Sequence, residues 1–168
     1  SVPAHSVREL ITLAKAKPGR LNYGSGLTGS TPHLAPELFK SMAGVDIVRI
    51  PYKGTGPALT ALVAGQVDIM IGPAASVMPQ ARAGRLRALA VASREPTKLV
   101  PGLPTIAASG LQGYEAVTMV GVFAPAGTPP TIVQRLHQGI VALLALPELK
   151  DRLTASGAEA VGSAPEAF

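Results

Sequence analysis

The sequence of 168 residues contains no cysteine and no tryptophan, and only three tyrosines and three phenylalanines. Without cysteine, neither a disulfide framework nor a thiolate metal site can form. The net charge is +5, but the basic residues are scattered and few aromatic rings are present to stack on bases. We therefore expect no nucleic-acid partner and a cationic surface that favours anionic solutes.

Long hydrophobic runs are also missing. No apolar stretch approaches the length of about 18 residues that a membrane-spanning helix needs. Hydrophobic residues nevertheless make up 47% of the chain and charged residues only 15%, a composition far from that of disordered proteins. The chain is expected to fold around a hydrophobic core, with its 16 prolines and 18 glycines at turns and helix ends.

Acidic residues are rare between positions 21 and 92, where only Glu37, Asp46 and Asp68 occur. None of them lies in a predicted loop that could face a ligand, so a cationic substrate or a hard metal ion would find no counter-charge there. The three histidines lack the close spacing of a metal motif, and no Gly-x-Ser-x-Gly nucleophile elbow occurs. We expect no metal site, no cofactor and no enzymatic activity.

Helical and extended patterns alternate along the chain. Capping boxes at Ser6–Glu9 and Ser163–Glu166 mark two helix starts. Periodicity predicts helices over 7–16, 32–43, 55–64, 76–83, 129–144 and 147–155, and strands over 21–23, 45–50, 67–71, 86–91 and 117–124. The longest helix should turn six residues inward: Ile132, Val133, Leu136, Ile140, Leu143 and Leu144. This order predicts an α/β fold with a mostly parallel sheet and helices on both faces.

Ligands of parallel sheets bind beyond the carboxyl ends of the strands, so the loops that follow strands are the candidate site. The first loop, 24–31, combines three glycines with four hydroxyl residues and leads into a helix start. Glycines let the backbone approach a ligand, and hydroxyls and helix amides can hold an anion. The alternative is that Ser30 or Thr31 only caps the helix and the glycines only turn the chain.

The same loop also matches the dinucleotide fingerprint Gly-x-Gly-x-x-Gly, through Gly24, Gly26 and Gly29. A Rossmann-like nucleotide-binding enzyme is therefore the alternative function. Its context is poor, because the second predicted strand ends in Pro51-Tyr52-Lys53, where a ribose-binding acid is needed.

Two further loops repeat parts of this design. The loop 52–57 has glycines, a hydroxyl and a helix start, and adds a cation at Lys53 and an aromatic edge at Tyr52. For Lys53 the alternative is an ordinary solvated lysine. The loop 72–76 offers its backbone around Gly72 and Pro73 and one hydroxyl, and is equally compatible with a plain turn.

Four segments in this order resemble the extracytoplasmic solute receptors of the tripartite tricarboxylate transporter family, often called Bug receptors. They are YGSGLTGSTPHLAPELF, IPYKGTGPALTALVAGQVDIM, AGRLRALAVAS and LPTIAASGLQGYEAVTMVGVFAPAGTPPTIVQRL. The resemblance implies a two-lobed periplasmic-binding-protein type II fold that captures a small carboxylate in the periplasm and delivers it to a membrane permease. It also implies that this chain is a fragment lacking the first part of lobe one, with lobe two at 4–118 and the returning part of lobe one at 119–168.

The resemblance assigns candidate ligand-binding residues one by one. These are Ser25, Gly26, Thr28, Ser30 and His33 in the first loop and Tyr52, Lys53, Gly54 and Thr55 in the second. The loop analysis adds Gly29 in the first loop and Gly72 and Pro73 in the third as further candidate ligand-binding residues. The chain departs from the family pattern at Ile71-Gly72-Pro73, where many relatives have a polar residue. The residues that contact the distal group of the ligand in the family therefore cannot be assigned to positions of this chain. A fragment of this kind would also expose apolar surface through which it could self-associate.

Overall fold

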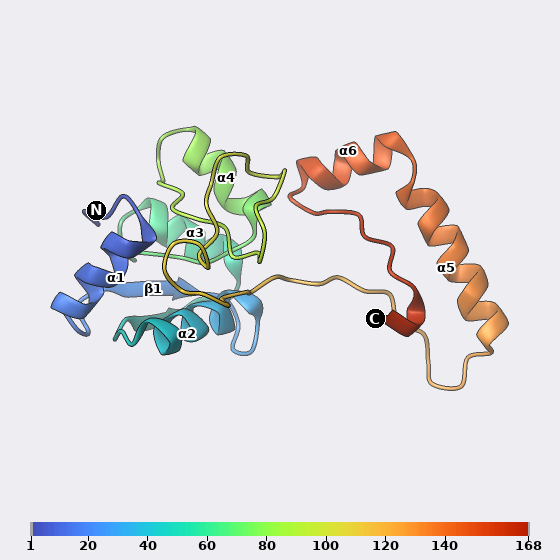
Figure 1. Cartoon of the computed structure of the whole chain (residues 1–168), viewed down its shortest axis with the longest axis horizontal. Coiled ribbons are helices and arrows are strands. Elements are labelled where there is room, and N and C mark those ends of the chain that lie inside the picture. The colour runs from blue at the N-terminus through green and yellow to red at the C-terminus, as the bar shows by residue number, and fades with distance from the viewer. Residues whose placement is uncertain (1, 168) are drawn as a thin grey trace. The chain divides into compact units, whose positions relative to one another are not determined.

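The computed structural model describes residues 2–167 and divides after Thr118 into two units. The first unit contains α1 (Val7–Ala16), β1 (Asn22–Ser25), α2 (Thr31–Ala43), β2 (Val48–Pro51), α3 (Thr55–Val63) and α4 (Ala74–Arg82). The second contains α5 (Pro130–Leu144), α6 (Pro147–Ala155) and the 3-10 turn η1 (Pro165–Ala167) (Figure 1).

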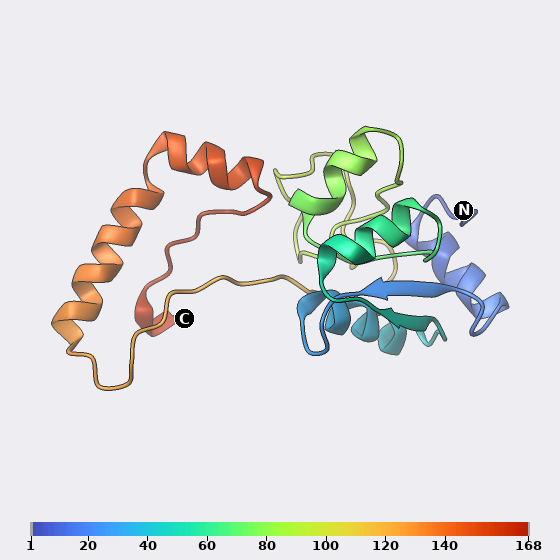
Figure 2. The same cartoon turned by 180° about the vertical axis from the view of Figure 1, so that it is seen from behind.

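The sheet of the first unit is built on a parallel pair. β1 and β2 run side by side in the same direction (Figure 2). Ser25 lies opposite Pro51. On the other edge of β1, Tyr23 forms an isolated parallel bridge with Ile69, and the Gly24 amide donates to the Ile69 carbonyl at 3.0 Å. The carboxyl ends of all three segments therefore meet at one edge.

Helices cover both faces of this sheet. Successive strand residues point to opposite faces, and Tyr23 reaches α2 by donating its hydroxyl to Glu37 at 2.5 Å. Gly24 faces α3, where a Cβ atom would lie 3.5 Å from the Ala58 Cβ and 3.1 Å from the Val67 Cγ2. The predicted α/β class with a parallel sheet between helices is confirmed.

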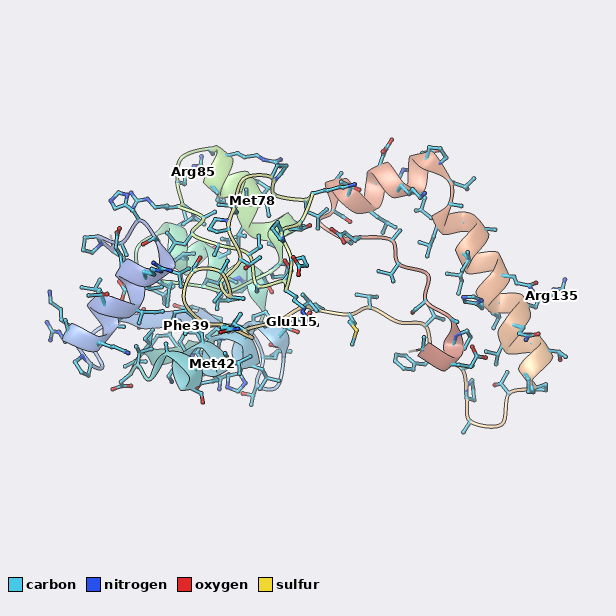
Figure 3. The ribbon with its side chains drawn as sticks, in the orientation of Figure 1. Phe39, Met42, Met78, Arg85, Glu115 and Arg135 are labelled. Carbon is cyan, nitrogen blue, oxygen red and sulfur yellow. The ribbon has the colours of Figure 1, made fainter. Side chains whose placement is uncertain are left out.

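The core gathers where α2 meets the segment before the unit boundary. Phe39 of α2, labelled in Figure 3, packs edge-to-face on Tyr114 with ring centroids 6.3 Å apart. Burying one such ring stabilises the fold by about 1.5–3 kcal/mol. The Tyr114 hydroxyl donates to the Ala35 carbonyl at 2.9 Å, and burial raises the pKa of Tyr114 to about 12. This contact ties the chain before Thr118 to α2.

Local sequence signals located the helices well. Ser6 caps α1 and accepts a hydrogen bond from the Glu9 amide, as the capping box predicted. Gly44 ends α2 in the left-handed conformation, which glycine adopts without a steric penalty. α4 begins at Ala74, two residues before the predicted start.

The strand predictions were less successful. β2 begins at Val48 rather than at residue 45, and the segments 67–71 and 86–91 make only single bridges. The predicted strand 117–124 is absent from the described residues, and Val120 is 93% exposed. A strand forms only where a neighbouring backbone pairs with it in register, and the composition of a segment does not supply that neighbour.

The second unit has no residue in the buried class among those described. The predicted inward face of α5 was therefore wrong for Ile132, Leu136 and Leu143, each about half exposed, because α6, η1 and the segment around Gly162 leave much of this helix uncovered within the unit. Val133, Ile140 and Leu144 are half-buried. The capping box at 163–166 leads only to the short turn η1. No helix among residues 2–167 is long and apolar enough to cross a membrane.

Gly24 lets α3 pack closely on β1, so we predict that Gly24→Ala destabilises the first unit by about 1–3 kcal/mol through overpacking. Gly56→Ala is the matched control, because nothing lies within 4 Å of its added Cβ. That control should be neutral or stabilising by up to about 1 kcal/mol. Urea denaturation measures both free energies of unfolding, and equal values would contradict the packing argument.

Candidate functional site

The first two predicted loops leave the sheet next to each other. The Tyr52 amide donates to the Ser25 carbonyl at 3.0 Å, which joins the two loops at their roots. Gly26 is buried between the two helix starts, where a Cβ atom would lie 3.3 Å from the Ser30 Oγ and 3.9 Å from the Gly54 carbonyl carbon. The beginnings of α2 and α3 therefore meet at one place.

Two hydroxyls of the first loop are used within the loop itself. Ser25 is fully buried, and its Oγ donates to the Gly26 carbonyl at 3.2 Å. The Ser30 Oγ donates to the Leu27 carbonyl at 2.6 Å and does not cap α2. Thr28 is exposed, and its Oγ1 accepts a hydrogen bond while its proton remains available. Of these three hydroxyls, only that of Thr28 is free to donate to a ligand.

His33 also supports the loop. Its Nδ1 accepts the amide hydrogen of Gly29 at 3.0 Å, and Gly29 has a φ of +84°, in the left-handed region that favours glycine. This contact closes the turn that leads into α2. Neither the Gly29 amide nor the His33 Nδ1 is left for a ligand in this arrangement.

Only some amides remain at the two helix starts. The amides of His33 and Leu34 both donate to the Ser30 carbonyl at 2.9 Å, and Pro32 has no amide hydrogen. Within residues 2–167, the amides of Thr31, Thr55 and Gly56 donate no hydrogen bond. Unpaired amides at a helix start carry partial positive charge and bind anions.

The polar groups of the second loop lie at the surface or close to it. Lys53 is exposed and its ammonium makes no hydrogen bond or ion pair in the described part of the chain, while Tyr52 is half-buried. Gly54 precedes α3 with a φ of +124°, which side-chain-bearing residues rarely adopt. The loop thus combines an exposed cation with a glycine that its backbone requires.

The third loop contributes less. Pro73 immediately precedes α4, and the nearest atom to an added Cβ on Gly72 would be the Met70 Cε at 2.9 Å. No hydrogen bond joins these two residues to the other loops in the described part of the chain. Their assignment to the site stays a prediction.

Arg49 is a site residue that the analysis of the loops missed. It lies in β2 opposite Tyr23, and its guanidinium reaches the first loop. Its Nε donates to the Ser25 Oγ at 2.8 Å, and its Nη2 donates to the Thr28 Oγ1 at 3.0 Å. The available signal was an arginine between Val48 and Ile50 in a strand, where an apolar residue is more common.

A charged cluster fixes α2 over β1. The Lys40 Nζ lies 3.0 Å from the Glu37 Oε1, and Glu37 also accepts the Tyr23 hydroxyl. Burial and the hydrogen bond to Glu37 raise the pKa of Tyr23. Burial disfavours ionisation of Glu37, but the hydrogen bonds from Tyr23 and Lys40 outweigh it and hold the pKa of Glu37 below its ordinary value. The cluster sets the position of α2 without entering the loops.

A pocket of about 260 Å³ lies between α2 and the segment 115–117. It is lined by Thr31, Leu34, Ala35, Leu38, Glu115, Ala116 and Val117. The walls are mostly apolar, and the exposed carboxylate of Glu115 (Figure 3) would repel an anion. This pocket is not suited to the ligand that the loops can hold.

Known proteins resemble this chain over nearly its whole length. The model of the tripartite tricarboxylate transporter family receptor matches residues 1–166. The chain belongs to this family. It is 41% identical, over 98% of its length, to a UPF0065 protein from the tcbD-tcbE intergenic region of Pseudomonas sp. strain P51, and 36% identical over 96% to protein BugT of Bordetella pertussis. It spans about half of each relative, 51% and 49%.

Solved structures show the same fold. The structure titled "R. palustris Rpa4515 with adipate" superimposes with a TM-score of 0.89 at 40% identity, covering 99% of this chain and 56% of that one. MatC of Rhodopseudomonas palustris with bound malate gives a TM-score of 0.79 at 33% identity, covering 98% and 55%. These neighbours confirm the predicted periplasmic-binding-protein fold and the family resemblance. The family is one of solute receptors and not of enzymes.

The Glu37 cluster predicts a pH dependence of stability. Since the folded-state pKa lies below the ordinary 4.5, the stabilisation is complete above that value and is lost as the pH falls through the folded pKa. Glu37→Gln should therefore be less stable than the wild type at pH 7, with the difference shrinking at pH 3–4. The midpoints of urea denaturation at pH 7 and at pH 3–4 measure this difference in stability. Glu115→Gln, at an exposed carboxylate, is the control and should change neither midpoint.

Proposed function

We propose that this chain is the larger part of a periplasmic receptor that captures a small organic carboxylate for the permease of a tripartite tricarboxylate-type transporter. The observation that carries the proposal is the meeting of two helix starts around Gly26, with the amides of Thr31, Thr55 and Gly56 unpaired. No acidic residue occurs in either loop to oppose a negative ligand.

The chemistry of the loops suits a carboxylate. Amide and hydroxyl donors bind an ionised oxygen more strongly than a neutral one, and they need no side-chain charge to do so. The Thr28 and Thr55 hydroxyls and the exposed Lys53 add donors around the same place. Neighbouring structures whose titles name adipate and malate support a carboxylate as the ligand class.

The remaining predicted residues take supporting parts in this proposal. Ser25, Ser30 and His33 shape the first loop through the hydrogen bonds described above. Gly26 lets the two helix starts come close, and Gly54 supplies the positive φ that precedes α3. Gly72 and Pro73 would border the far end of the ligand.

The division after Thr118 supports a two-lobed receptor. In this proposal residues 4–118 form lobe two, and residues 119–168 return to lobe one. Ligand capture would then close the two lobes on each other, a hinge motion that a permease can recognise.

Calorimetric titration of the natural protein that carries this chain tests the proposal. Adipate and malate should bind, while adipamide, which has the shape of adipate without its charges, should not. Binding of NAD in place of the acids would favour the nucleotide-binding alternative. Binding of adipamide as tightly as adipate would show that the loops do not select charge.

Thr55 offers a specific mutational test. Thr55→Val removes a hydroxyl at the start of α3, and loss of one hydrogen bond to a charged group costs about 1.5–3 kcal/mol, a ten- to hundredfold rise in Kd for the carboxylate. Thr60→Val is the matched control, since Thr60 lies on an exposed surface of the same helix and donates only to the Gly56 carbonyl. An equal Kd for both variants would exclude Thr55 from the site.

A further inference from the structure

One guanidinium holds three positions of the first loop. The Arg49 Nε donates to the buried Ser25 Oγ at 2.8 Å, and the Nη2 donates to the Thr28 Oγ1 at 3.0 Å. The same Nη2 lies 3.5 Å from the Gly26 carbonyl oxygen. No acidic side chain forms an ion pair with Arg49 in the described part of the chain, and the hydrogen bonds of its guanidinium all go to this loop.

The direction of these hydrogen bonds determines what each hydroxyl can still do. The Ser25 hydroxyl accepts a hydrogen bond from Arg49 and donates its own hydrogen to the Gly26 carbonyl. The Thr28 hydroxyl accepts from Arg49, and its own proton has no acceptor in the described residues. A hydroxyl that accepts from a cation becomes a stronger donor, because the bonds polarise one another.

We propose that Arg49 is a positioning residue that holds loop 25–28 in its ligand-ready shape and turns the Thr28 hydroxyl into a donor toward the bound carboxylate. This inference rests on the proposed function. The planar guanidinium has two donor directions at a fixed angle, which a lysine ammonium cannot reproduce. Arg49 would thus act on the ligand through Thr28 and not by contact.

A double-mutant cycle in the natural protein tests the relay, with adipate and malate as probes. Arg49→Lys and Thr28→Val should each weaken binding about tenfold, and together no more than about twentyfold, since both break the same chain of hydrogen bonds. Thr28→Ser keeps the hydroxyl and should bind within about threefold of the wild type. Arg85→Lys, at an exposed arginine that bonds only Gln80 (Figure 3), is the control.

Two binding results would overturn the proposal that Arg49 acts on the ligand through Thr28. A hundredfold loss in the double variant would mean that the two residues act independently. Wild-type affinity in Arg49→Lys combined with a loss in Arg49→Gln would mean that only the charge matters.

Hydrogen exchange of the ligand-free protein tests the positioning separately. Arg49→Lys should raise amide exchange at residues 25–29 about tenfold and leave α1 unchanged. Thr28→Val should raise amide exchange at residues 27–29, whereas Thr28→Ser should not. Because Thr28 is exposed, neither substitution should unfold the protein, so these two variants still test the positioning if Arg49→Lys fails to fold. If the wild type binds no acid, the proposed function fails, and unchanged exchange in these variants then overturns the positioning as well.

Discussion

The parallel pairing of β1 with β2 is the constraint on which the candidate site depends. With Ser25 opposite Pro51, both strands end at the same level, and the helices that follow them must begin side by side. Gly26 then allows the two starts to approach, because a side chain there would meet Ser30 and Gly54. Shifting the register by one residue would separate the loops and point Ser25 and Arg49 to the wrong faces.

Much of the hydrogen bonding around the site serves to prepare the protein and not to contact a ligand. Ser25, Ser30 and His33 satisfy backbone groups of their own loop, and the Glu37 cluster fixes the helix that follows. Such prior ordering reduces the conformational entropy that binding would otherwise cost. The few donors left unpaired are correspondingly well oriented.

The sequence predicted what local signals encode. Helix ends at Ser6 and Gly44 follow from capping chemistry, and the parallel class follows from the alternation of elements. The segment 117–124 has the composition of a strand, but pairing depends on a neighbour that local patterns do not report. Arg49 escaped notice for the same reason, since its link to Ser25 spans 24 residues and exists only through the strand register.

The attachment of Tyr114 to α2 has a mechanical consequence. Its hydroxyl bonds the Ala35 carbonyl in the second turn of the helix, and Thr118 follows only four residues later along the chain. The backbone that leads to the second unit is therefore attached to the same helix whose first turn borders the first loop, 24–31. A displacement of that backbone would act on α2 at Ala35 and also on Ala92, whose carbonyl accepts the Ala116 amide at 2.9 Å.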